Sequence, residues 1–485
     1  MKVIFVLYVF SVGIGLAQAP VGTIAGLVRD ASGATVDGAK IKASSLATGS
    51  TRTCATSERG DYSFPALLAG EYEVSVEAAG FQRTVRAAVV EAGATTTADF
   101  ALQVGDMNDK ITVDGASPQI QFESNQVGGV VTRNQIESLP LNGRNFLDLA
   151  KLEPGVTPPA RATNNRLTTS VLGAPVRGGG TRVTIDGGSI MYPATIGSLL
   201  NASQEVVQEF QITTVNLDTA TGLTSSGAIN IVTRSGGNEF HGSIFAFYRD
   251  HNVAAYPGLS RDLNNPDPFF QRRQYGYFLG GPIRRNRAFF FTNYEHTDQR
   301  GAYSIQPKTQ DFAPLGGIFP SPLLENQWTV RFDVRLSRNH NVFLRQTHDN
   351  NHAFTPLDAS IAFNFPSHWS QVTNWVDQSA GGLTSIIGPT VVNDARFFYL
   401  FLSTPERPSL PGECPGACVG AGSPGVNIMD GSVALGNPVP PALSGAVTSS
   451  PTASRGRREV IGCASVANGS TVPSVRRATP IYRLH

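Results

Sequence analysis

Few residues of this 485-residue chain have the type and spacing that chemistry requires. Cys414 and Cys418 flank a Pro-Gly turn that would let them form a disulfide, with free thiols or a metal site as alternatives. His340, His348 and His352 stand in polar, Asn-rich segments, which favours solvated loops over a metal centre. Phosphate-binding Gly-Lys-Ser/Thr loops, Gly-x-Ser-x-Gly elbows and His-Glu-x-x-His motifs are absent from the sequence. We therefore predict no catalytic residue, no bound metal and no cofactor.

The composition points to a mainly β protein. Only 15% of residues are charged, whereas there are 50 Gly and 31 Pro, as expected for many turns and strands. The net charge of +1 gives no electrostatic footprint for nucleic acid.

The first residues predict export. An apolar run from Val3 to Leu16 is too short to span a bilayer and is followed by small residues, as in a signal peptide over residues 1–19. Cleavage after Ala19 would leave Pro20 at the new N-terminus, so cleavage after Ala17 is an alternative, as is a buried first strand or helix. No later apolar stretch is long enough for a membrane helix, so membrane insertion would require a barrel.

Residues 20–105 are predicted to form a small antiparallel β-sandwich. The clearest strand is Glu71–Ala78, whose odd and even positions alternate between polar and apolar. Further short strands, separated by turns, are expected at 22–30, 39–46, 51–57, 60–64, 83–90 and 95–102.

The segment 328–350 has a strict two-residue alternation. The charged residues Arg331, Asp333 and Arg335 fall on one face of the strand. The other face carries the apolar residues Trp328, Val330, Phe332, Val334 and Leu336. A turn follows, and then a return strand from Val342 to His348. A soluble sheet with charges toward water and a membrane barrel with charges toward a wet lumen explain this hairpin equally well.

The remaining chain changes character twice. Residues 106–239 are rich in Gly, Thr, Asn and Ser and lack the apolar density of a large core, so we expect this region to pack inside something polar; one short helix is expected between Asn145 and Leu152. Residues 240–438 are rich in aromatics. Strands are expected there at 240–249, 274–281, 287–296, 328–336, 342–349, 371–386 and 391–402.

Two sets of phrases resemble known families. Residues 23–41, 59–81 and 101–105 resemble the carboxypeptidase regulatory-like domain, which has a transthyretin-like or carbohydrate-binding-like fold. The phrases LPLNGRNF (139–146), RVTIDGG (182–188), EFQITTVNLD (209–218), the run 227–250 and the run 280–295 look like TonB-dependent outer-membrane receptors of the Oar-like type.

This resemblance implies an architecture and partners. A mixed α/β plug at 106–239 would sit inside an antiparallel transmembrane barrel, of which residues 240–438 would be the N-terminal part. The barrel would lie in the outer membrane and contact its lipid. A TonB-type energy-transducing protein would pull on the plug and admit a substrate that the sequence does not identify, with a glycan as one candidate. The sandwich would be a spacer or a glycan- or partner-binding unit. The alternative function is a secreted or surface carbohydrate- or partner-binding module without transport.

The resemblance also assigns roles to residues. Ile111, Thr112 and Val113 are the candidate TonB box, because an extended β-rich peptide can add to a partner's sheet; the first strand of the plug is the alternative. A further set of residues is expected to shape the plug and dock it in the barrel, or alternatively to contact a ligand. These residues are Asn142, Gly143, Arg144, Arg177, Gly178, Asp186 and Gly187. In the barrel reading, Arg331, Asp333 and Arg335 face the lumen and Val330, Phe332 and Val334 face lipid.

The C-terminal part departs from the family. Seven expected strands are far fewer than the family's barrel has, so the barrel is predicted to be incomplete. Residues 439–485 contain six Arg, no Lys and one acidic residue, Glu459, and show no β alternation. We expect a disordered, aberrant tail from an altered reading frame or a truncated gene, and a product of that kind would not transport.

Overall fold

The protein was analysed as a computed structural model, which describes residues 21–105, 110–113, 127–141, 143–161, 167–171, 181–191, 200–215, 224, 227–255, 267, 269–305, 317–355, 370–387, 391–408, 426–427, 434–435, 458–461 and 465–466. The predicted signal peptide, Asn142, Arg177, Gly178, Cys414, Cys418 and most of the predicted tail lie outside the described residues.

The N-terminal part, here called the sandwich, consists of two packed sheets. One sheet contains β1 (Val21–Asp30), β4 (Asp61–Leu68), β7 (Thr95–Thr97) and β8 (Phe100–Leu102). The other has the order β3 (Thr51–Ala55), β2 (Lys40–Ser45), β5 (Gly70–Glu77), β6 (Arg83–Val90) and β9 (Lys110–Val113). The predicted strands are present, but the pairing is not purely antiparallel, because β1 pairs in parallel with β7 and β8, and β6 with β9.

The sandwich has an apolar core of its own. The two-residue period turns one side of each strand inward, so that Ile24 and Val28 of one sheet meet Ile41, Val74 and Val76 of the other, all fully buried. Tyr62 is also buried, and its hydroxyl donates to the carbonyl of Ala98 at 2.6 Å. Each strand contributes to this core through its own two-residue alternation, so the strands can be predicted from local sequence patterns alone.

The central part, here called the inner module, is built on a five-stranded sheet. Its order is β10 (Val127–Val131), β15 (Val207–Val215), β16 (Gly227–Thr233), β13 (Thr181–Ile185) and β14 (Gly188–Ser189), with β11 (Val156–Arg161) and β12 (Leu167–Val171) forming a separate hairpin. The helices described are α2 (Arg133–Ser138) and the 3-10 helices η2 (Phe146–Leu152) and η3 (Gln204–Val206). The helix expected at 145–152 is present as η2, in the tighter 3-10 form. The prediction of a mixed α/β region remains a prediction, because the described helices are few and short.

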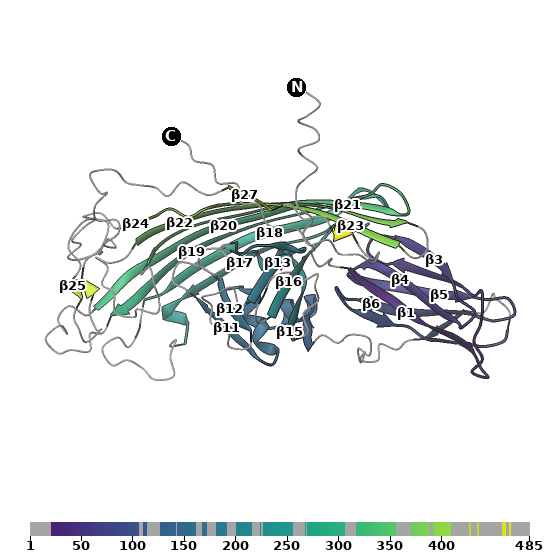
Figure 1. Ribbon diagram of the computed structural model, residues 1–485. Helices are drawn as coiled ribbons and strands as arrows, with labels where there is room; N and C mark the ends of the chain where they lie inside the picture. Colours follow the sequence, from purple (N-terminus) through teal and green to yellow (C-terminus); the bar gives the residue numbers. More distant parts are fainter. Residues whose placement is uncertain are drawn as a thin grey trace, which may run out of the picture.

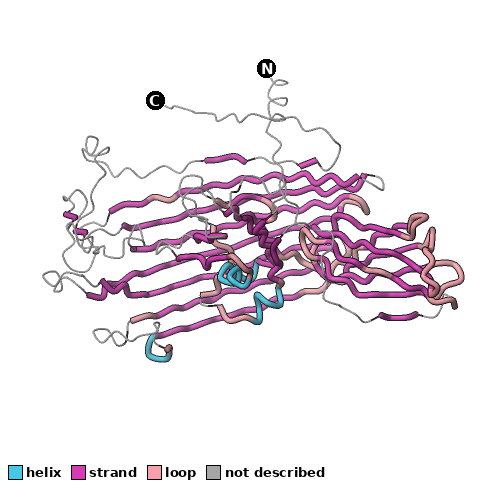
Figure 2. The backbone as a smooth tube through the Cα atoms, turned by 60° about the horizontal axis from the view of Figure 1, so that its bottom comes forward, coloured by secondary structure: helices cyan, strands magenta, loops and turns pink. Residues whose placement is uncertain are grey.

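The C-terminal part, here called the wall, is a curved antiparallel sheet. Its long strands run in chain order: β17 (His241–Asp250), β18 (Gln271–Arg284), β19 (Ala288–Ile305), β20 (Gly317–Arg335), β21 (His340–Thr355), β22 (Ser370–Ile387) and β23 (Val391–Ser403). Figure 1 shows the wall lying over the inner module, with the sandwich beside one end of both. Figure 2 shows the long strands side by side.

The seven expected wall strands are present, and several are longer than predicted. The strand β20 contains Pro320 and Pro322, and proline cannot donate a hydrogen bond to a neighbouring strand. The sequence therefore did not predict the first half of β20. The sheet is open, because β17 and β23 are not paired with each other in the described part of the chain.

Short elements complete the described structure. The 3-10 helix η5 (His251–Val253) follows β17, and β24 (Glu406–Pro408) pairs with β22. Two pieces of the predicted tail, β27 (Arg458–Ile461) and β28 (Ser465–Val466), pair with β23, and β25 (Val426–Asn427) pairs with β26 (Ala434–Leu435). None of the helices described has the length and apolar character needed to cross a bilayer.

The two faces of the wall have an inverted polarity. Arg331 is 4% exposed, whereas its neighbour Phe332 is 43% exposed; Arg345 is 3% exposed and Leu344 58%. At these positions the charged side chains point toward the inner module and their apolar neighbours point outward, while Val376 and Leu400 of the wall are buried against the core of the inner module. A soluble sheet would reverse this arrangement, whereas a wall with lipid outside and a polar lumen inside requires it.

Candidate functional site

Asp186 lies at the tip of a tight turn that the sequence predetermines. Asp186 and Gly187 have φ angles of 50° and 88° and join β13 to β14, a pattern for which an Asp-Gly pair is well suited. Gly188 follows, and a Cβ atom there would come within 2.2 Å of the Phe398 ring of the wall. The turn therefore fits against the wall because Gly188 has no side chain.

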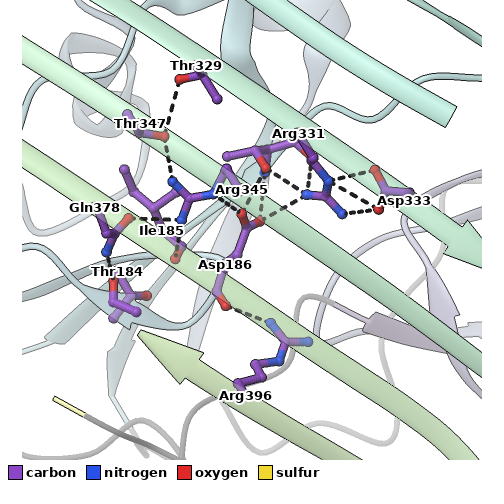
Figure 3. Close-up of polar contacts among 12 residues, drawn as sticks. Thr184, Ile185, Asp186, Thr329, Arg331, Asp333, Arg345, Thr347, Gln378 and Arg396 are labelled. Carbon is purple, nitrogen blue, oxygen red and sulfur yellow. Dashed lines mark hydrogen bonds and ion pairs between the residues drawn. The ribbon is translucent and has the colours of Figure 1, made fainter. Parts of the chain in front are cut away.

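The Asp186 side chain is fully buried and joins the inner module to the wall (Figure 3). Arg345 donates from Nε to Oδ2 at 2.8 Å, and Arg331 Nη1 lies 3.5 Å from Oδ1. Thr233 of β16 donates its backbone N–H and its hydroxyl to the same carboxylate, at 3.0 and 2.8 Å. Arg396 donates to the Asp186 carbonyl at 2.6 Å. These five residues are called the Asp186 cluster below.

The three arginines of the Asp186 cluster are balanced by Asp186 together with Asp333 and Asp394 of the wall. Burial opposes the negative charge of Asp186, but the guanidinium groups of Arg345 and Arg331 outweigh it, so the pKa of this carboxyl lies below its ordinary value. Removing one partner from a buried, hydrogen-bonded ion pair leaves an uncompensated charge and typically costs about 3–5 kcal/mol. The cluster thus fixes the position of the inner module.

The wall arginines are positioned by other wall residues. Arg331 donates from Nε and Nη2 to Asp333, two residues along the same face, at 2.9 and 2.8 Å. Arg396 makes the equivalent pair with Asp394 at 2.6 and 3.0 Å. Such bidentate pairs fix the orientation of the guanidinium planes.

A second group of charges, called the Glu205 cluster, lies between η3 and the wall. Glu205 accepts from Arg133 at 2.8 Å and from Arg144 at 2.6 Å, and Arg234 lies 3.5 Å away. Burial opposes the charge of Glu205, yet the hydrogen bond from Arg144 and the charge of Arg133 keep its pKa below the ordinary value. Arg144 also reaches Glu295 of β19, with Nε 3.2 Å from Oε1.

Arg144 connects the two parts through more than charge. Its guanidinium lies 4.1 Å from the ring centroid of Phe245 and 5.1 Å from that of Phe247, both on β17. Ser203 donates its hydroxyl to the other oxygen of Glu295 at 2.5 Å. The Glu205 cluster is therefore a second polar joint between the inner module and the wall.

The predicted site residues fall into three groups. Asp186, Gly187, Gly143, Arg144, Arg331 and Asp333 lie at these joints. Arg335 lies at the rim, where its guanidinium donates to Ser50 of the sandwich. The candidate TonB box, Ile111 to Val113, lies in β9 at the edge of the sandwich, and β9 is not part of the inner sheet.

The sequence did not single out Arg345, Arg396, Glu205 and Glu295. Arg345 and Arg396 lie 159 and 210 residues from Asp186, so only the sheet register brings them together. A usable signal did exist: Arg345 has Leu344 as an apolar neighbour, and Arg396 has Phe397, the same alternation that marked Arg331.

Other chemical groups give no site in the described residues. No set of three or more His, Cys, Asp and Glu side chains is placed there to bind a metal ion. Cys54 is a half-buried thiol, and burial raises its pKa to about 11. A thiol of this kind is a weak nucleophile at neutral pH.

Comparison with known proteins identifies the parts. Residues 232–319 and 318–443 match the outer membrane beta barrel domain, and residues 23–103 match the carboxypeptidase regulatory-like domain. The TonB-dependent transporter Oar of Myxococcus xanthus is 28% identical over 274 residues, which cover 52% of this chain and 25% of Oar. The chain is a homologue of the TonB-dependent transporter Oar.

This receptor homologue belongs to the outer membrane, and it spans about a quarter of the length of Oar. Among solved structures, the outer membrane transporter YddB of Escherichia coli is similar with a TM-score of 0.46 and 12% identity, covering 58% of this chain and 40% of that one. The siderophore receptor PirA of Acinetobacter baumannii is similar with a TM-score of 0.42 and 13% identity, covering 62% and 42%. The named relatives are transporters and receptors, and none is named as an enzyme.

Proposed function

We propose that this homologue takes part in TonB-dependent uptake across the outer membrane, with the inner module as a displaceable plug. In this account a TonB-type protein pulls on the segment between the sandwich and the plug, and a substrate of still unassigned class enters along the wall. The plug would be residues 106–239, of which β9 pairs with the sandwich and would form the link between the two parts. Residues 240–438 would be the barrel part and residues 1–19 the signal peptide.

The observation that carries this proposal is the Asp186 cluster. Its contacts between module and wall are ion pairs and hydrogen bonds, which water can replace once a mechanical pull opens the joint. Two polar joints, around Asp186 and Glu205, therefore suit a plug that leaves and returns. Val376 and Leu400 of the wall also join the apolar core of the inner module, and this apolar contact would be exposed to water whenever the plug leaves.

The position of β9 is relevant to where a TonB-type partner would bind. Its residues pair in parallel with β6, from Arg83↔Lys110 to Arg86↔Val113, and β9 is the last strand of its sheet. Strand addition needs an edge with free backbone groups, and an end strand offers one. We propose that Ile111, Thr112 and Val113 are the segment to which the TonB-type partner adds a strand.

Thiol labelling in cells tests the proposal. Val183 of β13 is 4% exposed, so a cysteine placed there in a chain whose four native cysteines are serine should react only when the plug moves. We expect labelling by a membrane-permeant maleimide in cells with TonB and little in cells without it. Equal labelling in the two strains would contradict the proposal. A cysteine at Leu46, which is 59% exposed, should react in both and serves as the control.

A further inference from the structure

The sandwich touches both other parts of the molecule through two of its loops. One loop, residues 45–50, meets the connector between the inner module and the wall, where the Asn238 N–H donates to the Ala47 carbonyl at 2.8 Å. The other loop, residues 91–93, meets β15, where the Ala92 N–H donates to Glu209 Oε1 at 2.6 Å. The two loops thus contact different parts of the molecule, one the connector and the other a strand of the inner module.

The first loop also reaches the turns of the wall. Asn238 and Asn286 exchange two hydrogen bonds, at 2.8 and 2.7 Å, and Asn286 lies in the turn between β18 and β19. Arg335, at the end of β20, donates to the Ser50 hydroxyl and to the carbonyl of Asn286 at 3.4 Å. The sandwich, the connector and two wall strands therefore meet at one point.

Glycines at the contacts show how close the approach is. Gly49 has φ +65°, and a Cβ there would lie 2.4 Å from Asn286 Oδ1 and 3.0 Å from Asn238 Nδ2. Gly93 has φ +71°, and its Cβ would lie 2.6 Å from Gln211 Oε1. Gly38 has the same φ of +65°, yet nothing lies within 4 Å of its Cβ position. Gly60 also has close neighbours, but these are Val28 and Thr35 of the sandwich itself, whereas Gly49 and Gly93 approach other parts of the molecule.

Clefts interrupt the contact. One, of about 780 Å³, is lined by Leu46 and Val89 of the sandwich and by Arg133 and Arg234 of the inner module. Another, of about 120 Å³, lies between the sandwich and the wall and is lined by Leu68 and Tyr72 on one side and by Val342 and Phe343 on the other. The polar contacts of the two loops therefore lie beside clefts and hold the parts together at separate points.

We propose that the sandwich is an intramolecular clamp, which fastens the inner module to the wall turns through loops 45–50 and 91–93. The clamp adds a third attachment to the Asp186 and Glu205 clusters. It acts at the end of the wall where β18 turns into β19 and β20 turns into β21. This role concerns the chain at rest and does not depend on transport.

Hydrogen exchange in the full chain in detergent tests the clamp. The amides of Ala92 and Asn238 should exchange slowly in the wild-type chain, because their partners lie across the contact. Gly49→Ala should speed the exchange of Asn238 by about tenfold or more, whereas Gly38→Ala, with the same backbone strain but open space, should leave it unchanged.

Arg335→Gln alters the wall side only and cannot unfold the sandwich, so it should speed the exchange of Asn238 as well, by a smaller factor. Fast exchange of Asn238 in the wild-type chain would overturn the clamp. So would an equal effect of Gly49→Ala and Gly38→Ala, because the change would then not depend on the contact. Unchanged exchange in both Gly49→Ala and Arg335→Gln would overturn it too.

Discussion

The sandwich and the inner module are stabilised in opposite ways. The sandwich buries Ile24, Ile41, Val74 and Val76 between two sheets of its own, a core that needs no other part of the chain. The inner module also has an apolar core, but this core includes Val376 and Leu400 of the wall, and its edge carries Asp186 among arginines from three wall strands. One part is complete alone, whereas the other is complete only against the wall.

This difference indicates which contacts can open and close reversibly. Apolar burial grows with area and gives a permanent unit, whereas a paired charge is stable only while all its partners stay in place. A part meant to stay folded while another moves should have the first kind of core. The moving part should have the second kind of seat.

Asp186→Ala should have the largest effect. The side chains of Arg345 and Arg331 would lose a buried anionic partner, so we expect the inner module to lose roughly 3–5 kcal/mol of its attachment to the wall. Hydrogen exchange should rise in β13 and β16 and stay low in β2 and β5 of the sandwich. Asp37→Ala, at an exposed Asp-Gly turn of the sandwich, is the matched control and should cost less than about 0.5 kcal/mol. Loss of protection in the sandwich as well would contradict the contrast.

Raising the pH should weaken the contact between sandwich and inner module. Burial raises the pKa of Glu209 to about 7, and the nearby charge of Glu91 adds to this. Because the folded pKa is raised, the stabilisation is fully present below about pH 4.5 and is lost as the pH rises through about 7. The free energy of opening should fall on the order of 1–3 kcal/mol over this window.

The variant Glu209→Gln checks that prediction, because its amide can still accept from Ala92 and does not titrate. Exchange of the Ala92 amide should become pH-independent beyond the intrinsic rate. The variant leaves the other ionisable residues that line the same cleft unchanged, namely Glu71, Glu91, Arg133, Glu137, Arg234, His241 and Arg331. A wild-type slope that survives in Glu209→Gln would assign the effect to one of them.

Ile41→Val should have the smallest effect and should be confined to the sandwich. Removing one methylene from a fully buried side chain costs about 0.5–1.5 kcal/mol. Thermal unfolding followed by exchange in β2 and β5 should show the loss, with β13 and β16 unchanged. A matching loss in the inner module would mean that the two parts unfold as one unit.

Sequence patterns predicted the sandwich far better than the site. Each sandwich strand is a local two-residue alternation, and the same alternation placed Arg331 and Phe332 on opposite faces of β20. Asp186 was recognised through its turn, but its partner Arg345 belongs to a return strand whose His and Asn neighbours looked like a solvated loop. Partners separated by such distances depend on the register of five wall strands, which no local pattern contains.

The burial of charged side chains was the other feature that the sequence did not reveal. Part of the charge on wall strands is buried by the inner module, as for Glu295 and Arg396, and a single strand does not show what covers it. The candidate TonB box illustrates the same limit: its β-rich composition predicted a strand, but its pairing with β6 could not be predicted because the sequence does not show which edge is free.

A double-mutant cycle on Asp186 and Arg345 tests the central claim most directly. Unfolding of the inner module would be measured for Asp186→Asn, Arg345→Gln and the double variant in the full chain. The account predicts that each single variant is destabilised and that the double variant is less destabilised than the sum, by roughly 0.5–3 kcal/mol, because it leaves neither charge alone. Effects that add within about 0.3–0.5 kcal/mol would show that the pair does not fasten the inner module to the wall.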